Sequence, residues 1–298
     1  MLCLVDYRNL VGRSRVMRSR CIHGGVEYDA SLRDACLSII SSPRASWAVF
    51  CLDGSPNYRL SIHPEYKGTR KKKEEDSDAL PVYPVHLLVQ DIRVTAQTFN
   101  TRVSFACSPF READDVIASI VKGVSDNVSE NLYLDERLSW WVDFGLSFGG
   151  WEKGVIQDVS DVCIMSSDSD LQQLLRVSPE QRVAVVSKMS LVDTVYEVSD
   201  TFKKKDVNSP AELLAYKIFE GDNGDNITRC RVVPPRKCGN TFWKTLNTES
   251  KLMSFVHTPD LFPELVGFVD IDRLRLNTRL VYLDVAAYPL ASPYFLQL

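Results

Sequence analysis

Short apolar runs alternate along this chain with longer segments in which apolar residues recur at helical spacing. Helical spacing occurs in Ser31–Ile40, Val85–Phe99 and Ala113–Val121. Short strands that alternate with helices are typical of a mainly parallel central sheet flanked by helices. The pattern therefore predicts an α/β fold. The runs that predict buried strands are Leu2–Val5, Trp47–Leu52, Val162–Met165 and Val183–Val186.

The pattern changes after about Ser199, where the chain becomes mostly helical. One helix there is well marked, because Ser209 is suited to the N-cap, Pro210 to the first position and Glu212 to a capping box. We therefore expect an α/β core over residues 1–199 and a smaller, mostly helical part over residues 200–298. The stretch Asn131–Lys153, rich in Trp and Gly, predicts a surface excursion packed by its own aromatic residues.

Acidic residues follow three of the predicted strands. Asp6 follows the first, Asp53 the second, and Asp168 with Asp170 the third. One aspartate at a strand end is usually a turn residue or a helix cap. Because ligand sites in open α/β sheets collect beyond the carboxyl ends of the strands, three such strands favour a site at that edge.

Two further acidic clusters stand at predicted helix ends. Glu112, Asp114 and Asp115 open a helix, where the helix dipole accounts for one or two acids. Three acids within four positions repel one another, which suggests that cations lie between them. Asp222 and Asp225, in GDNGDN, are three residues apart and would share one side of a turn. By itself this last motif is equally consistent with an ordinary turn.

Together these positions supply carboxylate oxygens, which suit Mg²⁺ or Mn²⁺ and not zinc. The eight cysteines form no CxxC pair and the four histidines form no cluster, so a zinc site or a disulfide framework is not expected. Two or more divalent ions in such a site are the usual apparatus of phosphodiester hydrolysis. The nine candidate ligands are Asp6, Asp53, Glu112, Asp114, Asp115, Asp168, Asp170, Asp222 and Asp225.

The net charge of -4 does not exclude a nucleic acid as partner. Without the nine candidate ligands, the rest of the chain carries five net positive charges. Basic residues also gather in two runs, one at 67–73 and the other at Lys203–Lys205. Apolar runs are too short for a signal peptide or a membrane span, so a cytoplasmic protein is expected.

Four motifs carry a resemblance to a known family. HPEYKGTRKKK, READDVIASI, SSDSDLQQLL and FEGDNGDNI follow one another in this order. They resemble motifs of the 5′→3′ exonuclease and flap endonuclease superfamily, most closely its bacteriophage members, including the phage RNase H type. With both strand-end aspartates, the resemblance extends from Asp6 to about Asn226, which is roughly three quarters of the chain.

The resemblance implies roles for individual residues. The acids from Asp6 to Asp170 are similar to the family's primary metal cluster, and Asp222 and Asp225 to its outer carboxylates. Lys67 and Arg70 would contact the scissile phosphate and stabilise its charge. Together with the metal ligands Asp168 and Asp170, they would be the catalytic residues. Tyr66 would stack on a displaced base. Residues 67–110, which include Lys71, Lys72 and Lys73, would form a helical arch over the single-stranded 5′ end.

The chain departs from the family after GDNGDN. Many members have a glycine-rich helix–hairpin–helix loop there, often with a potassium ion. This chain has ITRCRVVPPRKCGN, in which Pro234 and Pro235 donate no backbone hydrogen bonds, so a potassium site is doubtful. The positive charges of four residues would hold the phosphates of the duplex instead: Arg229, Arg231, Arg236 and Lys237.

The resemblance implies a metal-dependent nuclease that acts on DNA with a 5′ flap, nick, gap or free 5′ end. RNA primers in RNA–DNA hybrids are a second possible substrate, and replication proteins possible partners. A PIN-like endoribonuclease shares the strand-end acids, but YKGTR and GDNGDN argue against it. A non-catalytic, structure-specific DNA-binding protein is a further alternative, and loss of the metal carboxylates would be its mark.

Overall fold

The computed structural model describes residues 1–54, 58–68, 80–107, 111–122, 147–149, 161–177, 182–186, 200–232, 242–283 and 294–297. The chain divides into two compact units. Unit 1 comprises Met1–Pro56, Glu74–Tyr196 and Asp284–Leu298, and unit 2 comprises Asn57–Lys73 and Glu197–Leu283.

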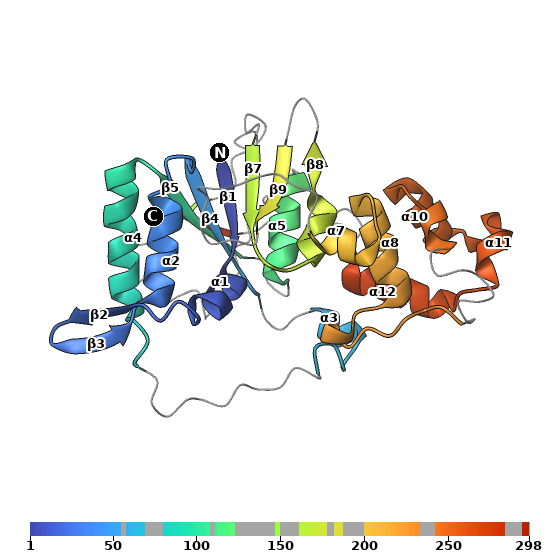
Figure 1. Cartoon of the computed structure of the whole chain (residues 1–298), viewed down its shortest axis with the longest axis horizontal. Coiled ribbons are helices and arrows are strands. Elements are labelled where there is room, and N and C mark those ends of the chain that lie inside the picture. The colour runs from blue at the N-terminus through green and yellow to red at the C-terminus, as the bar shows by residue number, and fades with distance from the viewer. Residues whose placement is uncertain are drawn as a thin grey trace. The chain divides into compact units, whose positions relative to one another are not determined.

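Unit 1 is built on an eight-stranded sheet in the order β6-β10-β5-β4-β1-β7-β9-β8. Figure 1 labels the part of this order from β5 to β8. The five central strands are parallel, whereas β10, β6 and β8 pair antiparallel at the two sides. The expected mainly parallel sheet is confirmed. The central strands are β5 (Arg102–Cys107), β4 (Trp47–Leu52), β1 (Leu2–Asp6), β7 (Asp161–Met165) and β9 (Arg182–Val186). The others are β6 (Ser147–Gly149), β8 (Arg176–Val177) and β10 (Tyr294–Gln297).

Helices cover both faces of this sheet. The first face carries α1 (Tyr7–Ser14), α2 (Ser31–Ile40) and α4 (Val85–Phe99), with α2 and α4 side by side (Figure 1). Ile39 and Ile92 from these helices join Phe50 and Phe105 from the strands in one buried apolar cluster. The buried residues of α5 (Ala113–Lys122) are not part of that cluster, although α5 contacts β1, β4 and β5. Since successive strand residues face opposite sides, α5 packs on the other face.

Smaller elements complete the described part of unit 1. The strands β2 (Arg20–His23) and β3 (Val26–Asp29) form a separate two-stranded sheet. The short 3-10 helix η1 (Asp170–Leu174) follows β7 and contacts α5.

Unit 2 is helical in its described residues. α8 (Pro210–Glu220) contacts α12 (Ile271–Val281), α10 (Glu249–His257) and the 3-10 helix η3 (Phe242–Thr245). Phe219 of α8 stacks on Phe255 of α10 with ring centroids 6.0 Å apart. The remaining elements are α3 (Tyr58–Ile62), α7 (Asp200–Lys205), η2 (Asn223–Asp225), η4 (Pro259–Leu261) and α11 (Pro263–Val266).

The N-terminus of α8 follows the sequence prediction with one change. Ser209 is the N-cap, and its hydroxyl accepts from the Glu212 N–H at 3.1 Å. The Glu212 carboxylate accepts from the Asn208 N–H at 3.0 Å, where a capping box would use the N–H of Ser209. The helix start is therefore capped from both sides by local residues.

The division into units differs from the predicted boundary in two segments. Residues 58–68 fold with the C-terminal helices, because the Arg59 Nε donates to the Leu280 carbonyl at 2.9 Å and the Tyr58 hydroxyl to the Arg279 carbonyl. The C-terminal strand β10 belongs to the sheet of unit 1. Both depend on long-range contacts, which no local sequence pattern predicts.

The region expected to form an arch also differs in part. α4 and β5 lie within residues 67–110, yet they belong to the core of unit 1, where Leu88, Val89 and Phe105 are buried. Residues 69–79 and 108–110 lie outside the described residues, as does the Trp-rich stretch except for β6. In the part of the chain that the structure describes, no helix is both long and apolar enough to cross a membrane.

Candidate active site

The strand-end acids of unit 1 gather at one edge of the sheet. β1 lies between β4 and β7, with Asp6 in register with Cys51 and Val5 in register with Met165. The three strands run parallel, so their carboxyl ends meet. Asp6, Asp53 and the pair Asp168 and Asp170 therefore emerge from neighbouring strands at the same edge, as the sequence predicts.

Asp6 is the last residue of β1 and the N-cap of α1. Its Oδ1 accepts from the Asn9 N–H at 3.0 Å, and its Oδ2 accepts from the Ser166 hydroxyl at 2.8 Å. The Ser166 Oγ in turn accepts from the Asp168 N–H at 3.0 Å. Ser166 therefore connects the ends of β1 and β7. Its only sequence signal is its place between the strand and the acidic loop, and sequence reasoning missed it.

Asp53 holds the start of α5 and pairs with an arginine. Its Oδ1 accepts from the Ala113 N–H at 2.8 Å, at the first residue of α5. Its Oδ2 lies 2.9 Å from the Arg8 Nη1, whose side chain is 70% exposed. An ion pair this exposed adds little to stability. The Ala113 contact is the informative one, because it brings the end of β4 to the acids of α5.

The acids that open α5 occupy different environments. Glu112 and Asp115 are buried, and the Asp115 Oδ2 accepts from the Glu112 N–H at 3.1 Å. Burial raises the pKa of Asp114 well above its usual value, and the negative charges of four neighbours raise it further. These neighbours, in order of effect, are Asp168, Asp6, Asp170 and Glu112. Five of the nine predicted acids therefore share one electrostatic environment.

The acidic loop after β7 is held by its own backbone. The Asp168 Oδ1 accepts from the Asp170 N–H at 2.9 Å, and Asp170 begins η1. Asp168 and Asp170 are partly exposed. The fold thus places two carboxylates at the edge beside buried Asp6 and Glu112.

The donor set suits a hard divalent cation, since it consists of carboxylate oxygens whose mutual repulsion a cation relieves. The carboxylates of Asp6, Asp53, Asp115 and Asp168 nevertheless accept hydrogen bonds from protein donors. Among the described residues, no three His, Cys, Asp or Glu side chains are grouped so that they hold a metal ion together. The residues present fit such an ion by their chemistry and charge.

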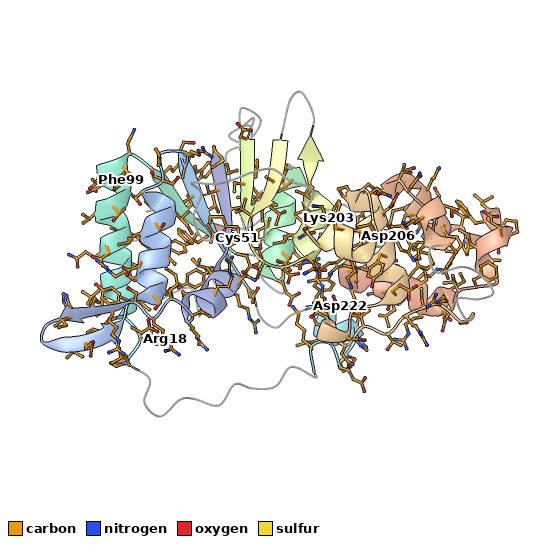
Figure 2. The ribbon with its side chains drawn as sticks, viewed as in Figure 1. Arg18, Cys51, Phe99, Lys203, Asp206 and Asp222 are labelled. Carbon is orange, nitrogen blue, oxygen red and sulfur yellow. The ribbon has the colours of Figure 1, made fainter. Side chains whose placement is uncertain are left out.

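Asp222 and Asp225 belong to unit 2, whereas the other seven acids belong to unit 1. The Asp222 Oδ2 lies 3.3 Å from the Nζ of Lys217, a lysine that is buried, and the Asp222 Oδ1 accepts from the Gly224 N–H. Figure 2 labels Asp222 in its turn. Asp225 is buried, and its Oδ2 accepts from the Tyr66 hydroxyl at 3.1 Å.

The segment of residues 63–68 is bound to this turn. The Lys67 N–H donates to the Asp225 carbonyl and the Asn226 Nδ2 to the Glu65 carbonyl, both at 3.0 Å. His63 Nε2 lies 3.1 Å from the Asn226 carbonyl. The YKG and GDNGDN motifs, some 160 residues apart, therefore form one structural element.

The predicted stacking role of Tyr66 does not agree with its position. Its side chain is only 4% exposed, its hydroxyl is bonded to Asp225, and the Lys67 Nζ lies 4.9 Å from its ring centroid. A ring enclosed in this way offers no face to a base. Tyr66 instead anchors the segment that carries Lys67.

One predicted DNA contact is also corrected. The Arg231 side chain is 8% exposed, and its Nη2 lies 3.3 Å from the Glu220 Oε2, so this charge is used inside unit 2. Arg229 is exposed and remains available. The other predicted contacts lie outside the described residues: Arg70, Lys71, Lys72, Lys73, Arg236 and Lys237.

No protein-family model and no curated protein sequence matches this chain. Solved structures of a bacteriophage T5 protein do match it. One, described as the D15 protein co-crystallised with metal ions, is 18% identical, with a TM-score of 0.52 over 95% of this chain and 89% of the T5 chain. The chain shares the fold of the T5 5′-exonuclease.

Two other T5 structures match this chain with similar identity and TM-score. A D15 flap endonuclease variant in a pseudo-enzyme–product complex with DNA and metal ions is 19% identical, with a TM-score of 0.52. A T5 5′-exonuclease with bound zinc gives the same identity and score, and both alignments cover 95% of this chain and 89% of the T5 chain. The predicted likeness to the phage 5′ nucleases is confirmed for the fold.

Proposed function

We propose that this chain is a divalent-metal-dependent nuclease that hydrolyses phosphodiester bonds of DNA at 5′ ends and 5′ flaps. The observation that carries the proposal is the convergence of strand-end acids at the carboxyl edge of the sheet, where Ser166 joins Asp6 to the Asp168 backbone and Asp53 holds the first N–H of α5. The raised pKa of Asp114 beside these acids agrees with it. Such crowding of negative charge at the carboxyl edge of a sheet is costly to a fold and suits a cation site. The shared fold of the T5 nuclease supports it.

Mg²⁺ or Mn²⁺ is the proposed cofactor, as two or more ions. Bound there, the ions would activate the attacking water and neutralise charge that develops on the phosphate. The seven acids of unit 1 are the proposed primary ligands, and Asp222 and Asp225 the proposed outer ones. Ser166 has a positioning role, because one hydroxyl orients Asp6 and fixes the backbone of Asp168.

Lys67 and Arg70 are proposed to bind the scissile phosphate. Lys67 has a backbone φ of 56° and donates its N–H to the Asp225 carbonyl, so the backbone that carries it is held firmly. A positive charge fixed beside the reacting phosphate would stabilise the transition state more than the ground state.

The proposed substrates are DNA duplexes with a 5′ flap, nick, gap or free 5′ end. One of the T5 structures is described as a complex with DNA. We extend the proposal to RNA primers in RNA–DNA hybrids, to a role in replication with other replication proteins as partners, and to a cytoplasmic location. The extensions in substrate and partners rest on the family resemblance, and the proposed location rests on the short apolar runs of the sequence.

Cleavage of a 5′-labelled flap duplex tests the proposal. We expect cuts near the junction in Mg²⁺ and none in EDTA. Asp168→Asn/Asp170→Asn should lower the rate by several orders of magnitude. Asp260→Asn/Asp272→Asn, which removes the same charge from two exposed residues of unit 2, should cleave like the parent.

Two other outcomes would replace the proposal. If the protein binds flaps in Mg²⁺ without cutting them, and no other divalent ion gives cleavage, it would be a non-catalytic structure-specific DNA-binding protein. Cleavage of RNA hairpins with no cleavage of DNA flaps would indicate a PIN-like endoribonuclease.

A further inference from the structure

Three exposed lysines end helix α7 of unit 2. Phe202 on the same helix is 3% exposed and Val207 beyond it is 4% exposed, so this side is anchored in the core. Asp206, the first residue after the helix, has a φ of 54°. With Phe202 buried, Lys203, Lys204 and Lys205 are left at the surface. Figure 2 labels Lys203 and Asp206 on this element.

Neighbouring elements extend this surface. The Lys205 Nζ donates to the Tyr216 hydroxyl of α8 at 3.0 Å and lies 4.6 Å from its ring centroid. Tyr216 packs edge-on against Trp243 of η3, with ring centroids 5.7 Å apart. Lys244, next to Trp243, pairs with Asp206 at 2.8 Å. We call the four lysines at 203–205 and 244 the α7 lysine surface.

Among the described side chains, one of the four lysines of this surface pairs with an acid. Asp206 pairs with Lys244, which leaves the charges of the other three lysines. Within the described residues, Lys203 and Lys204 take part in no ion pair. Besides Glu65, Asp206 and Glu249, the exposed acids among the described residues of unit 2 lie on η4, on α11 and at the start of α12, and α11 lies at the other end of unit 2 from α7 (Figure 1). These acids are Asp260, Glu264, Asp270 and Asp272.

The basic side chains that the sequence predicts to hold the duplex form no comparable positive surface in the described part of unit 2. Arg231 is buried against Glu220, and of the predicted four only Arg229 is both described and exposed. Two adjacent exposed lysines on a short, anchored helix are suited to phosphate oxygens, because each ammonium contacts a phosphate as a point charge without reading a base.

We propose that the α7 lysine surface binds the phosphate backbone of duplex DNA, with Lys203 and Lys204 as direct contacts and Lys205 held ready by Tyr216. The inference rests on the proposed function only in taking DNA as the partner. It assigns unit 2 a sequence-independent duplex contact outside the segment that follows GDNGDN.

The test measures binding of a labelled duplex by fluorescence anisotropy in EDTA, over a series of salt concentrations, where no cleavage interferes. Lys203→Gln/Lys204→Gln should bind several-fold more weakly. The slope of log affinity against log salt should fall by about 0.9 for each lysine lost. Lys203→Arg/Lys204→Arg, which keeps the charge, should retain the parent's slope.

A second control removes the same charge elsewhere. Arg44 and Arg102 are exposed in unit 1, just before β4 and at the first residue of β5, away from the carboxyl edge. Arg44→Gln/Arg102→Gln should leave the slope unchanged. An unchanged slope in the lysine-to-glutamine variant would overturn the inference, as would an equal loss in this control.

The outcome is separable from the proposed function. A parent that cleaves flaps while the lysine-to-glutamine variant binds with the parent's affinity and slope refutes the inference alone. A parent that cuts nothing in Mg²⁺, with a reduced slope in the variant, refutes the nuclease and supports the surface. Each variant should unfold at the same temperature as the parent, and this control shows that substitutions of exposed residues leave the fold intact.

Discussion

Asp114 lies among four other carboxylates, and burial together with their charges raises its pKa above the ordinary value of 3.8. Its ionised form is therefore less favourable in the folded chain than in the unfolded one. The resulting loss of stability is absent below about pH 3.8, grows as the pH rises toward the raised pKa, and is complete above it.

Asp114→Asn should for this reason unfold at a higher temperature than the parent in EDTA at neutral pH. The difference should shrink as the pH falls toward the ordinary pKa, where the parent's carboxyl is also neutral. Thermal unfolding of unit 1 at several pH values measures this. Added Mg²⁺ should stabilise the parent more than the variant. A less stable variant in EDTA at neutral pH would show that protein contacts already compensate this charge.

Gly221 is required at the start of GDNGDN for two physical reasons. Its φ is +74°, and a Cβ there would lie 2.2 Å from the Ile227 carbonyl oxygen and 2.8 Å from the Arg229 nitrogen. Both atoms belong to backbone that cannot easily move away. The glycine therefore permits the turn that carries Asp222 and Asp225.

Gly221→Ala should lower the free energy of unfolding of unit 2 by about 2–4 kcal/mol. Gly267→Ala is the matched control, because a Cβ there meets nothing within 4 Å, and it should change stability by less than about 0.5 kcal/mol. Urea denaturation compares the two variants. Equal effects would mean that the turn relaxes around the added methyl group.

At the scale of elements, the helices that local signals predicted are present as α2, α4, α5 and α8. α4 begins after Pro84 and ends at Phe99, before the C-cap Asn100 with its φ of 52°, so both bounds agree with the prediction. β5 was missed because Ser104 interrupts its apolar residues. Ser104 is buried, and its hydroxyl accepts from the Trp47 indole N–H at 3.0 Å. This hydrogen bond from the neighbouring strand β4 satisfies the polar Ser104 side chain inside the sheet.

The segment of residues 58–68 depends on Tyr66, and Tyr66→Phe tests this dependence. It removes the hydroxyl that donates to the buried Asp225 carboxylate and keeps the ring, so we expect a loss of about 1.5–3 kcal/mol. Tyr58→Phe, which removes an exposed hydroxyl bonded to a neutral carbonyl, should cost about 1 kcal/mol or less. Urea denaturation gives both values. A Tyr66→Phe protein as stable as the parent would show that the bond to Asp225 does not hold this segment in place.

For the whole molecule, the chain crosses between the two units more than once. Residues 58–68 leave unit 1 and fold with unit 2, and residues 294–297 return to add β10 between β5 and β6. A single cut therefore cannot separate the units. This connectivity has a direct consequence for truncated proteins.

A chain that ends at residue 199 should lose amide protection from hydrogen exchange in residues 58–68 and in β5. The first loses its partners in unit 2, and the second loses β10 and exposes a strand edge. A chain that lacks only residues 284–298 should lose protection in β5 and keep it in residues 58–68. Protection of both segments in the 1–199 chain would contradict the observed division.

The sequence by itself determined the mainly parallel sheet, its four apolar strands and the acids at their ends. Apolar periodicity and helix caps are local, and parallel strands must bring their carboxyl ends to one edge. It also indicated the phage 5′ nuclease fold through four motifs in order. Only the tertiary structure decided that Ser166 joins Asp6 to Asp168, that Tyr66 is enclosed against Asp225, and that Arg231 is used by Glu220. Ser166, Tyr66 and Arg231 each depend on a partner 11 to 160 residues away in sequence, and no short pattern states which distant group a polar side chain will find.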